Sequence, residues 1–277
     1  MKILQDTYTL NNGVKIPKIG LGTWQVPNGE ETYNAVLMAL KNGYRHIDTA
    51  QNYGNEESVG KAIKDSKIPR EDIFITSKLE SAIKNYEETI ESFEETLKKL
   101  DVSYLDLFLI HAPWPWNEIG KNCDEGNVKA FKAMEQLYKD GKIKAIGVSN
   151  FSVNDVKNIL TNCEITPHVN QIGYFIGLNN DEIHSFCDDH NILVEAYSPL
   201  AIGTALQNNT IKSIANKYDK TPAQICIRYL LELNALPLPK STHEHRIIEN
   251  SNVDFTISQT DMKTLKAIDD DPRRFDG

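Results

Sequence analysis

The sequence predicts a closed (β/α)8 barrel, and three observations support this fold class. Short apolar runs alternate with longer amphipathic stretches along all 277 residues. Eight of the apolar runs have the length of buried parallel strands, and their ends are spaced by roughly 31 residues on average, the size of one βα unit. No polar linker separates the units, so we expect a single domain over residues 1–277. An open doubly wound sheet is the main alternative.

Each unit pairs a strand with a helical stretch. The expected strands cover residues 18–24, 44–49, 73–79, 104–111, 143–150, 168–172, 192–198 and 235–240, and helical periodicity is clearest over 31–43, 55–66, 85–100, 127–141, 153–160 and 222–233. Thr221 and Gln224 form a capping box, and Gly43 and Gly141 are typical helix ends. The residues before the first unit are expected to form a hairpin that closes the barrel bottom. Extra loops are expected over 112–127 and 198–210.

The composition is that of an ordinary globular protein with an acidic surface. Hydrophobic residues make up 40% of the chain, and 30 Lys and Arg against 39 Asp and Glu give a net charge of -9. Such a chain is a poor general binder of nucleic acids or anionic membranes. The polar N-terminus does not resemble a signal peptide, and no apolar run approaches the ~20 residues of a membrane helix. We therefore expect a cytoplasmic monomer without nucleic-acid or membrane partners.

Several patterns resemble known sites but lack their defining spacing. The four cysteines are too scattered for a zinc site or a disulfide framework. The segment 54–62 has one spacer residue too many for a phosphate loop, and no G-x-G-x-x-G motif is present. His243-Glu244-His245 lacks metal-ligand spacing and is typical of a solvated helix. No metal site is predicted.

Four chemically active residues fall at neighbouring strand ends. Asp48 ends the second expected strand, Lys78 the third and His111 the fourth, and Tyr53 lies just beyond the second. In a barrel these carboxyl ends converge on one mouth. A Tyr hydroxyl can donate a proton, and a Lys ammonium held by an Asp is expected to lower its pKa from ~10. Each residue alone has an ordinary structural explanation, but their convergence favours an acid–base site.

These residues lie in segments that together resemble one family. GYRHIDTAQNYGNEESVG (43–60), LPKSTHEHRIIEN (238–250) and IGVSNF (146–151) resemble the signatures of the aldo-keto reductases, and shorter motifs follow in the expected order. The resemblance spans essentially the whole chain. It is strongest to small bacterial-type members such as glyoxal or methylglyoxal reductases, 2,5-diketo-gluconate reductases and microbial prostaglandin F synthases.

The resemblance implies NADPH-dependent reduction of aldehydes and ketones, such as α-dicarbonyls or keto sugars, with NADPH as cofactor and a small carbonyl compound as partner. Tyr53 would be the general acid, tuned by Lys78 and Asp48, and His111 would orient the carbonyl. Ser149, Asn150 and Gln171 would bind the nicotinamide carboxamide, Tyr197 would stack on its ring, and Ser198, Pro199 and Leu200 would line the pyrophosphate. The remaining implied cofactor contacts are Thr23, Asp48, Lys240, Ser241, Thr242, Arg246, Glu249 and Asn250, with Lys240, Ser241 and Arg246 at the adenosine 2′-phosphate.

The chain departs from the family pattern around the substrate. The expected substrate contacts are Trp24, Tyr53, His111, Ala112 and Trp114. Ala112 stands where most members carry Trp, which predicts a wide pocket unless Trp114 fills the space. Residues 172–176 and Ala201 also differ from the usual pattern, and few residues follow the last expected helix, which leaves little room for a long C-terminal specificity loop.

Two other functions are also compatible with the sequence. One is a barrel that binds NADPH as a redox-sensing regulatory module without catalysis. The other is an isomerase or lyase in which Lys78 forms a Schiff base with a carbonyl substrate.

Overall fold

The computed structural model describes residues 2–178 and 180–269. Eight strands in this part of the chain form one parallel sheet in the order β10-β9-β8-β7-β6-β5-β4-β3. The strands are β3 (Leu21–Gly22), β4 (His46–Asp48), β5 (Phe74–Leu79), β6 (Leu107–Ile110), β7 (Ile146–Ser149), β8 (Val169–Gly173), β9 (Leu193–Tyr197) and β10 (Leu236–Leu238). Every one lies inside a range expected from the sequence or within one residue of it.

Two backbone hydrogen bonds join the first strand of the sheet to the last. The amide of Gly20 donates to the carbonyl of Pro237 at 3.2 Å, and that of Gly22 donates to Pro239 at 3.0 Å. A Cβ on Gly22 would lie 3.2 Å from the carbonyl oxygen of Leu238, so glycine permits this close approach. The sheet is therefore closed into the predicted (β/α)8 barrel, and the open-sheet alternative is wrong.

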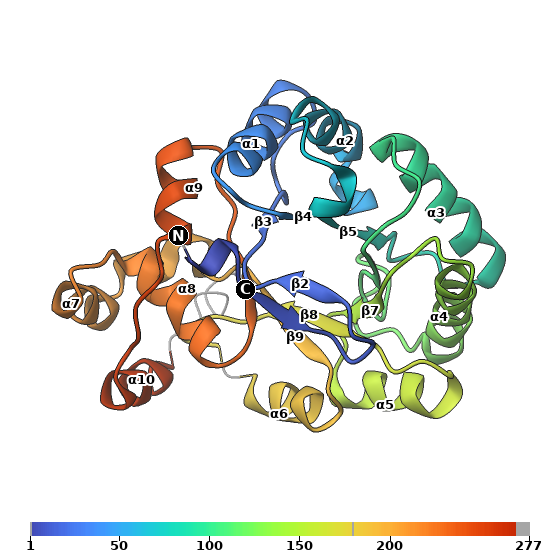
Figure 1. The fold of residues 1–277 in the computed structure, drawn as a ribbon. Helices are drawn as coiled ribbons and strands as arrows, with labels where there is room; N and C mark the ends of the chain where they lie inside the picture. The colour runs from blue at the N-terminus through green and yellow to red at the C-terminus, as the bar shows by residue number, and fades with distance from the viewer. Residues whose placement is uncertain (1, 179, 270–277) are drawn as a thin grey trace.

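Helices surround the barrel, as Figure 1 shows. They are α1 (Glu30–Lys41), α2 (Glu56–Asp65), α3 (Tyr86–Leu100), α4 (Asp124–Lys139), α5 (Val153–Asn162), α6 (Asp181–Asp189), α7 (Asn209–Lys217), α8 (Pro222–Glu232), α9 (Glu244–Ser251) and α10 (Gln259–Lys266). The capping box of Thr221 and Gln224 is present at the start of α8. The two expected long loops follow β6 and β9, and the second contains a kinked 3-10 segment, η4 (Ala201–Gln207).

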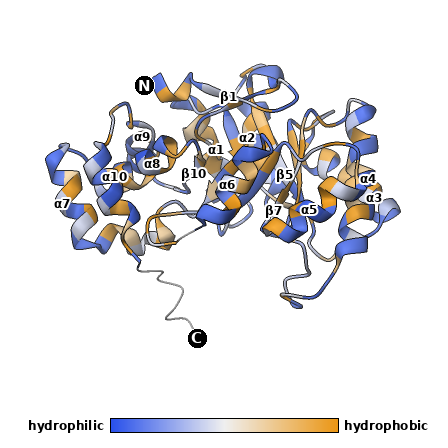
Figure 2. Ribbon diagram, turned by 90° about the horizontal axis from the view of Figure 1, so that it is seen from below, coloured by the Kyte–Doolittle hydropathy of each residue, from blue (hydrophilic) through white to orange (hydrophobic). Residues whose placement is uncertain are grey.

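The predicted hairpin closes the bottom of the barrel. Strands β1 (Thr7–Thr9) and β2 (Lys15–Pro17) pair antiparallel and lie across the barrel in Figure 1. Leu10 and Ile16 pack into a cluster with strand residues such as Leu107 and Leu236. In Figure 2 the orange of hydrophobic residues gathers on the barrel strands at the centre, whereas the surrounding helices alternate between polar and apolar residues. Residues 270–277, where a C-terminal specificity loop was not expected, lie outside the described residues.

Candidate active site

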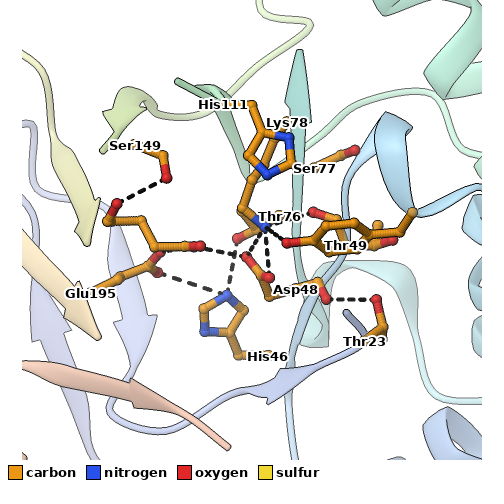
Figure 3. A network of polar contacts seen from close by, with 12 residues as sticks. Thr23, His46, Asp48, Thr49, Thr76, Ser77, Lys78, His111, Ser149 and Glu195 are labelled. Carbon is orange, nitrogen blue, oxygen red and sulfur yellow. Dashed lines mark hydrogen bonds and ion pairs between the residues drawn. The ribbon is translucent and has the colours of Figure 1, made fainter. Parts of the chain in front are cut away.

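Lys78 lies at the centre of the four residues predicted to act together (Figure 3). It is fully buried, and its Nζ donates to Asp48 Oδ1 at 2.7 Å, Asp48 Oδ2 at 2.8 Å and the carbonyl oxygen of Thr49 at 2.9 Å. Burial is the largest influence and opposes the charge on Lys78, but Asp48, Tyr53 and Glu195 together outweigh it, so the pKa of Lys78 is raised. A Schiff base requires a neutral amine. The geometry therefore argues against the Schiff-base alternative.

The Tyr53 hydroxyl lies 3.4 Å from the same Lys78 nitrogen. Tyr53 ends a short 3-10 segment, η2 (Gln51–Tyr53), which follows β4 and brings the phenol over the ammonium group. Burial raises the pKa of Tyr53 to about 12; Lys78 acts in the opposite direction and the Asp48 charge adds to the rise. Lys78 thus lowers the pKa of Tyr53 as expected, but burial outweighs this effect and the net shift is upward. At neutral pH Tyr53 carries the proton that a general acid needs.

His111 lies immediately after β6 and is 6% exposed. The centroid of its ring is 5.6 Å from that of Tyr53, in an edge-on arrangement. Burial and the charges of Lys78 and Lys84 lower the pKa of His111 to about 3. The imidazole is therefore neutral at physiological pH and can donate a hydrogen bond to a carbonyl oxygen without transferring a proton.

The sequence singled out Ala112 and Trp114 as substrate contacts beyond His111, but the indole that lies against His111 belongs to Trp116. The Trp116 centroid lies 5.3 Å from that of His111 at an interplanar angle of 88°, and Trp114 packs on Trp116 at 5.2 Å. Ala112 is fully buried, and its carbonyl oxygen accepts a hydrogen bond from Lys84 Nζ at 2.7 Å. The opening expected at Ala112 is not seen, because the residue is fully enclosed, and the indole against His111 is that of Trp116.

A second polar layer lies below Lys78 and Asp48. Gln171 Nε2 donates to Asp48 Oδ2 and to Glu195 Oε2, both at 2.8 Å. Glu195 Oε1 lies 3.9 Å from His46 Nε2, which contacts Thr76 Oγ1 at 2.9 Å. Figure 3 shows this layer as a chain of contacts that leads from Glu195 to the Lys78 centre. Asp48 is thus held from two sides.

Three further predicted cofactor residues meet at the ends of β7 and β9. The Tyr197 hydroxyl donates to Asn150 Oδ1 at 2.7 Å, and Asn150 Nδ2 donates to the carbonyl oxygen of His111 at 3.0 Å. Ser149 Oγ donates to the carbonyl oxygen of Gln171 at 2.8 Å. Asn150 adopts a positive φ of 62°, which Asn tolerates better than most residues. These contacts link side chains at the ends of β7 and β9, the strands on either side of β8, to the backbone of His111.

The other predicted cofactor residues lie on the loops after β3, β9 and β10 and on α9. Lys240 and Arg246 are exposed, and neither forms an ion pair with the described residues. Glu249 accepts a hydrogen bond from Thr221 Oγ1 at 2.7 Å, so it supports the start of α8. Just after β3, Thr23 Oγ1 donates a hydrogen bond to the carbonyl oxygen of Asp48, and the neighbouring Trp24 is exposed. Ser198, Pro199 and Leu200 follow β9, and Ser241 and Thr242 follow β10. Asn250 is buried in α9.

These residue types fit NADPH. Unpaired cations suit a 2′-phosphate, and the amide and hydroxyl groups around His111 suit a carboxamide, which both donates and accepts hydrogen bonds. Residues 2–178 and 180–269 contain no group of three His, Cys, Asp or Glu side chains arranged to hold a metal ion. Among the same residues, no helix combines the length and apolar character needed to cross a membrane.

Three contributors were missed by sequence reasoning. Trp116 was overlooked because the family comparison drew attention to the position directly after His111. Glu195 was overlooked because it precedes the strand-end residues, although a charged residue within an otherwise apolar strand is a signal for a buried polar contact. Lys84, which fixes the backbone at Ala112, carried no recognisable signal.

Comparison with known proteins agrees with this geometry. Residues 18–270 match the model of the aldo/keto reductase family. Glyoxal reductase from Bacillus subtilis (strain 168) is 45% identical over 271 residues, which cover 98% of this chain and 95% of that protein. MGS-M4, an aldo-keto reductase from a Medee basin deep-sea metagenome library, has a TM-score of 0.89 and 44% identity, and the match covers 96% of each chain. The aldo-keto reductase of Bombyx mori, solved in complex with NADP, has a TM-score of 0.87 and 31% identity over 95% of this chain and 92% of that one.

A family match over most of the chain and relatives of this similarity settle the classification that the resemblance suggested. This chain belongs to the aldo/keto reductase family and is an oxidoreductase that acts on carbonyl or CH–OH groups.

Proposed function

We propose that this enzyme reduces small aldehydes and ketones, with α-dicarbonyls and keto sugars as the leading substrate classes, and that Tyr53 is the proton donor. The observation that carries the proposal is the 3.4 Å contact between the Tyr53 hydroxyl and a Lys78 ammonium held by both oxygens of Asp48. The relative named glyoxal reductase supports the substrate class.

The aldo/keto reductase family uses NADP(H), and the cofactor supplies a hydride when bound. His111, neutral at physiological pH, holds the carbonyl oxygen by a hydrogen bond. Tyr53 donates its proton to the same oxygen as negative charge develops on it, and the Lys78 ammonium stabilises the phenolate that remains. Asp48 keeps Lys78 in place. Ser149, Asn150 and Gln171 hold the carboxamide end of the cofactor.

Replacement of Tyr53 by Phe tests the proposal. The ring keeps its packing against His111 and loses only the proton donor. We expect the rate of NADPH oxidation with glyoxal or methylglyoxal to fall roughly 10²–10⁴-fold, with the NADPH dissociation constant almost unchanged. Activity within a few-fold of the parent across a panel of aldehydes, α-dicarbonyls and keto sugars would remove Tyr53 from this role. The same panel decides against a purely regulatory NADPH-binding module if any substrate turns over.

We further propose that residues 1–277 act as one catalytic unit, as a monomer in the cytoplasm. The four cysteines, all free, support a reducing compartment. Light scattering of the purified protein gives the oligomeric state directly, and fractionation of the producing cells gives the compartment.

A further inference from the structure

Glu195 is a fully buried carboxyl group in the layer below the catalytic residues. It lies on β9 directly opposite Gln171 on β8 in the parallel register. Its Oε2 atom accepts a hydrogen bond from Gln171 Nε2 at 2.8 Å, and the same nitrogen donates to Asp48 Oδ2 at 2.8 Å. One side-chain amide is thus shared between two carboxyl groups.

This arrangement fixes which way the amide of Gln171 faces. An amide nitrogen offers two N–H donors, whereas its oxygen only accepts. Asp48 is held by the Lys78 ammonium and presents a lone pair to Gln171. The opposite orientation would place the amide oxygen against Asp48 Oδ2 and forfeit both hydrogen bonds. Both N–H groups of Gln171 are in use, so its Oε1 is the only polar atom of that side chain that remains to meet a ligand.

The hydrogen bond does not depend on the charge of Glu195. Burial and the neighbouring Asp48 charge raise the pKa of Glu195 to about 8, with Gln171 and Lys78 acting in the opposite direction. Glu195 Oε1 has no hydrogen-bond partner among the described residues and is the oxygen that can carry a proton. Oε2 therefore remains an acceptor for Gln171 in both charge states. Among the described residues, the ion-pair contact recorded for Glu195 is with His46, whose pKa is lowered to about 3 by burial and by Lys78.

We propose that Glu195 is a positioning residue that, together with Asp48, locks the amide of Gln171 so that its oxygen accepts a hydrogen bond from the carboxamide of NADPH. The inference rests on the proposed cofactor role of Gln171. It adds a residue that touches neither cofactor nor substrate, and it assigns the direction of one hydrogen bond.

A double-mutant cycle on NADPH affinity tests the coupling. Glu195→Met keeps the length of the side chain and removes the acceptor, whereas Glu195→Gln retains an acceptor. Gln171→Leu removes the amide itself. NADPH dissociation constants are measured by quenching of tryptophan fluorescence, a readout that does not require turnover, and thermal unfolding confirms that each variant is folded. If Glu195→Met does not fold, Glu195→Leu replaces it in the cycle.

We expect Gln171→Leu and Glu195→Met each to weaken NADPH binding about tenfold, and Glu195→Gln to stay within about threefold of the parent. In the Gln171→Leu background, Glu195→Met should have no further effect, because its influence passes through that amide. Glu56→Met is the matched control, since Glu56 is also a buried carboxyl group but bonds to Ser77 Oγ at 2.7 Å. It should leave NADPH affinity unchanged.

Other outcomes overturn the inference in distinguishable ways. Additive effects of Glu195→Met and Gln171→Leu, or a Glu195→Gln variant as weak as Glu195→Met, would show that Glu195 does not act by orienting Gln171. If Gln171→Leu weakens binding and Glu195→Met does not, the inference fails while the proposed function stands. If Gln171→Leu and Lys240→Ala both leave NADPH affinity intact, the proposed cofactor site fails and the inference fails with it.

Discussion

The indole of Trp116 lies edge-on against the imidazole of His111, with ring centroids 5.3 Å apart. Tyr53 meets His111 in a similar edge-on contact, so His111 is in contact with two aromatic rings. Trp116 is 39% exposed and belongs to the loop after β6, whereas Tyr53 belongs to the segment after β4. A long loop thus supplies the aromatic group that the residue directly after His111 does not.

Trp116 should therefore govern how firmly a substrate is held beside His111. We expect Trp116→Ala to reduce kcat/KM for methylglyoxal about tenfold, since loss of a partly buried aromatic ring forfeits ~1.5 kcal/mol of apolar contact. Trp116→Phe keeps a ring and should lose less than half of that free energy. Steady-state kinetics on both variants checks this. If Trp116→Ala and Trp116→Phe change kcat/KM equally, or if neither changes it, the ring of Trp116 does not contact the substrate.

We expect enlargement of Ala112 to change the stability of the protein and not its substrate preference. Its side chain is fully buried, so Ala112→Trp has no space to occupy. We expect a loss of ~1–3 kcal/mol in the free energy of unfolding, measured in urea, from overpacking. Ala112→Gly, which adds no volume, is the control and should cost less. An Ala112→Trp variant with parental stability and altered substrate preference would instead support the open pocket expected from the sequence.

The Lys78–Asp48 pair should show strong coupling in stability. Lys78→Met leaves Asp48 buried without its cation, and we expect a loss of ~3–5 kcal/mol in the free energy of unfolding. Adding Asp48→Asn should recover much of that loss, because no uncompensated charge remains. Both proteins should be inactive as reductases, which separates stability from catalysis. A double variant less stable than Lys78→Met would contradict an electrostatic origin of the loss.

Lys240 and Arg246 should determine the preference for NADPH over NADH. Each is an exposed cation, and one charge-assisted contact to a phosphate contributes ~1.5–3 kcal/mol. Lys240→Ala should therefore weaken NADPH at least about tenfold while NADH affinity changes little. Lys129→Ala, an exposed lysine on α4, is the control for net charge. Equal weakening of both cofactors would make Lys240 a structural residue.

The periodicity of apolar residues predicted where the barrel strands lie, because each of these strands is buried on both faces and each helix packs one apolar face against the sheet. The strand ends then placed Asp48, Lys78 and His111 together, since closure brings all carboxyl ends to one mouth. The short helices α6, α7 and α10 were not individually identified, because eight or nine residues give only two turns of periodic signal.

The details of the site depended on tertiary packing that no local pattern encodes. The position of Trp116 follows from a loop held by Ser81 Oγ, which accepts from the Trp116 amide at 3.2 Å, and by Lys84 at Ala112. The pKa of Tyr53 depends on how deeply its phenol is buried, and burial outweighs the adjacent Lys78 charge. Neither quantity can be read from the spacing of residues along the chain.

Glu195 should also make the stability of the protein depend on pH. Its pKa rises from 4.5 to about 8 on folding, so between these values the folded protein binds a proton that the unfolded chain releases. The contribution of Glu195 to stability is therefore present below about pH 4.5 and is lost as pH rises, by ~1.4 kcal/mol per pH unit. His46 and His111 act in the opposite direction, because their pKa values fall to about 3 and the unfolded chain binds protons first below ~6.5.

Glu195→Gln isolates this effect, because Gln does not titrate. Relative to the parent, we expect the variant to gain roughly 2–4 kcal/mol in the free energy of unfolding between about pH 5 and pH 8, measured by urea unfolding in matched buffers. The acid-side loss due to His46 and His111 should persist in both proteins. Glu87→Gln, an exposed position on α3, should run parallel to the parent at every pH. The opposite result would be a Glu195→Gln variant whose unfolding free energy follows that of the parent at every pH. Glu195 would then be ionised throughout this range, and burial would not raise its pKa enough to keep a proton beside Asp48 at neutral pH.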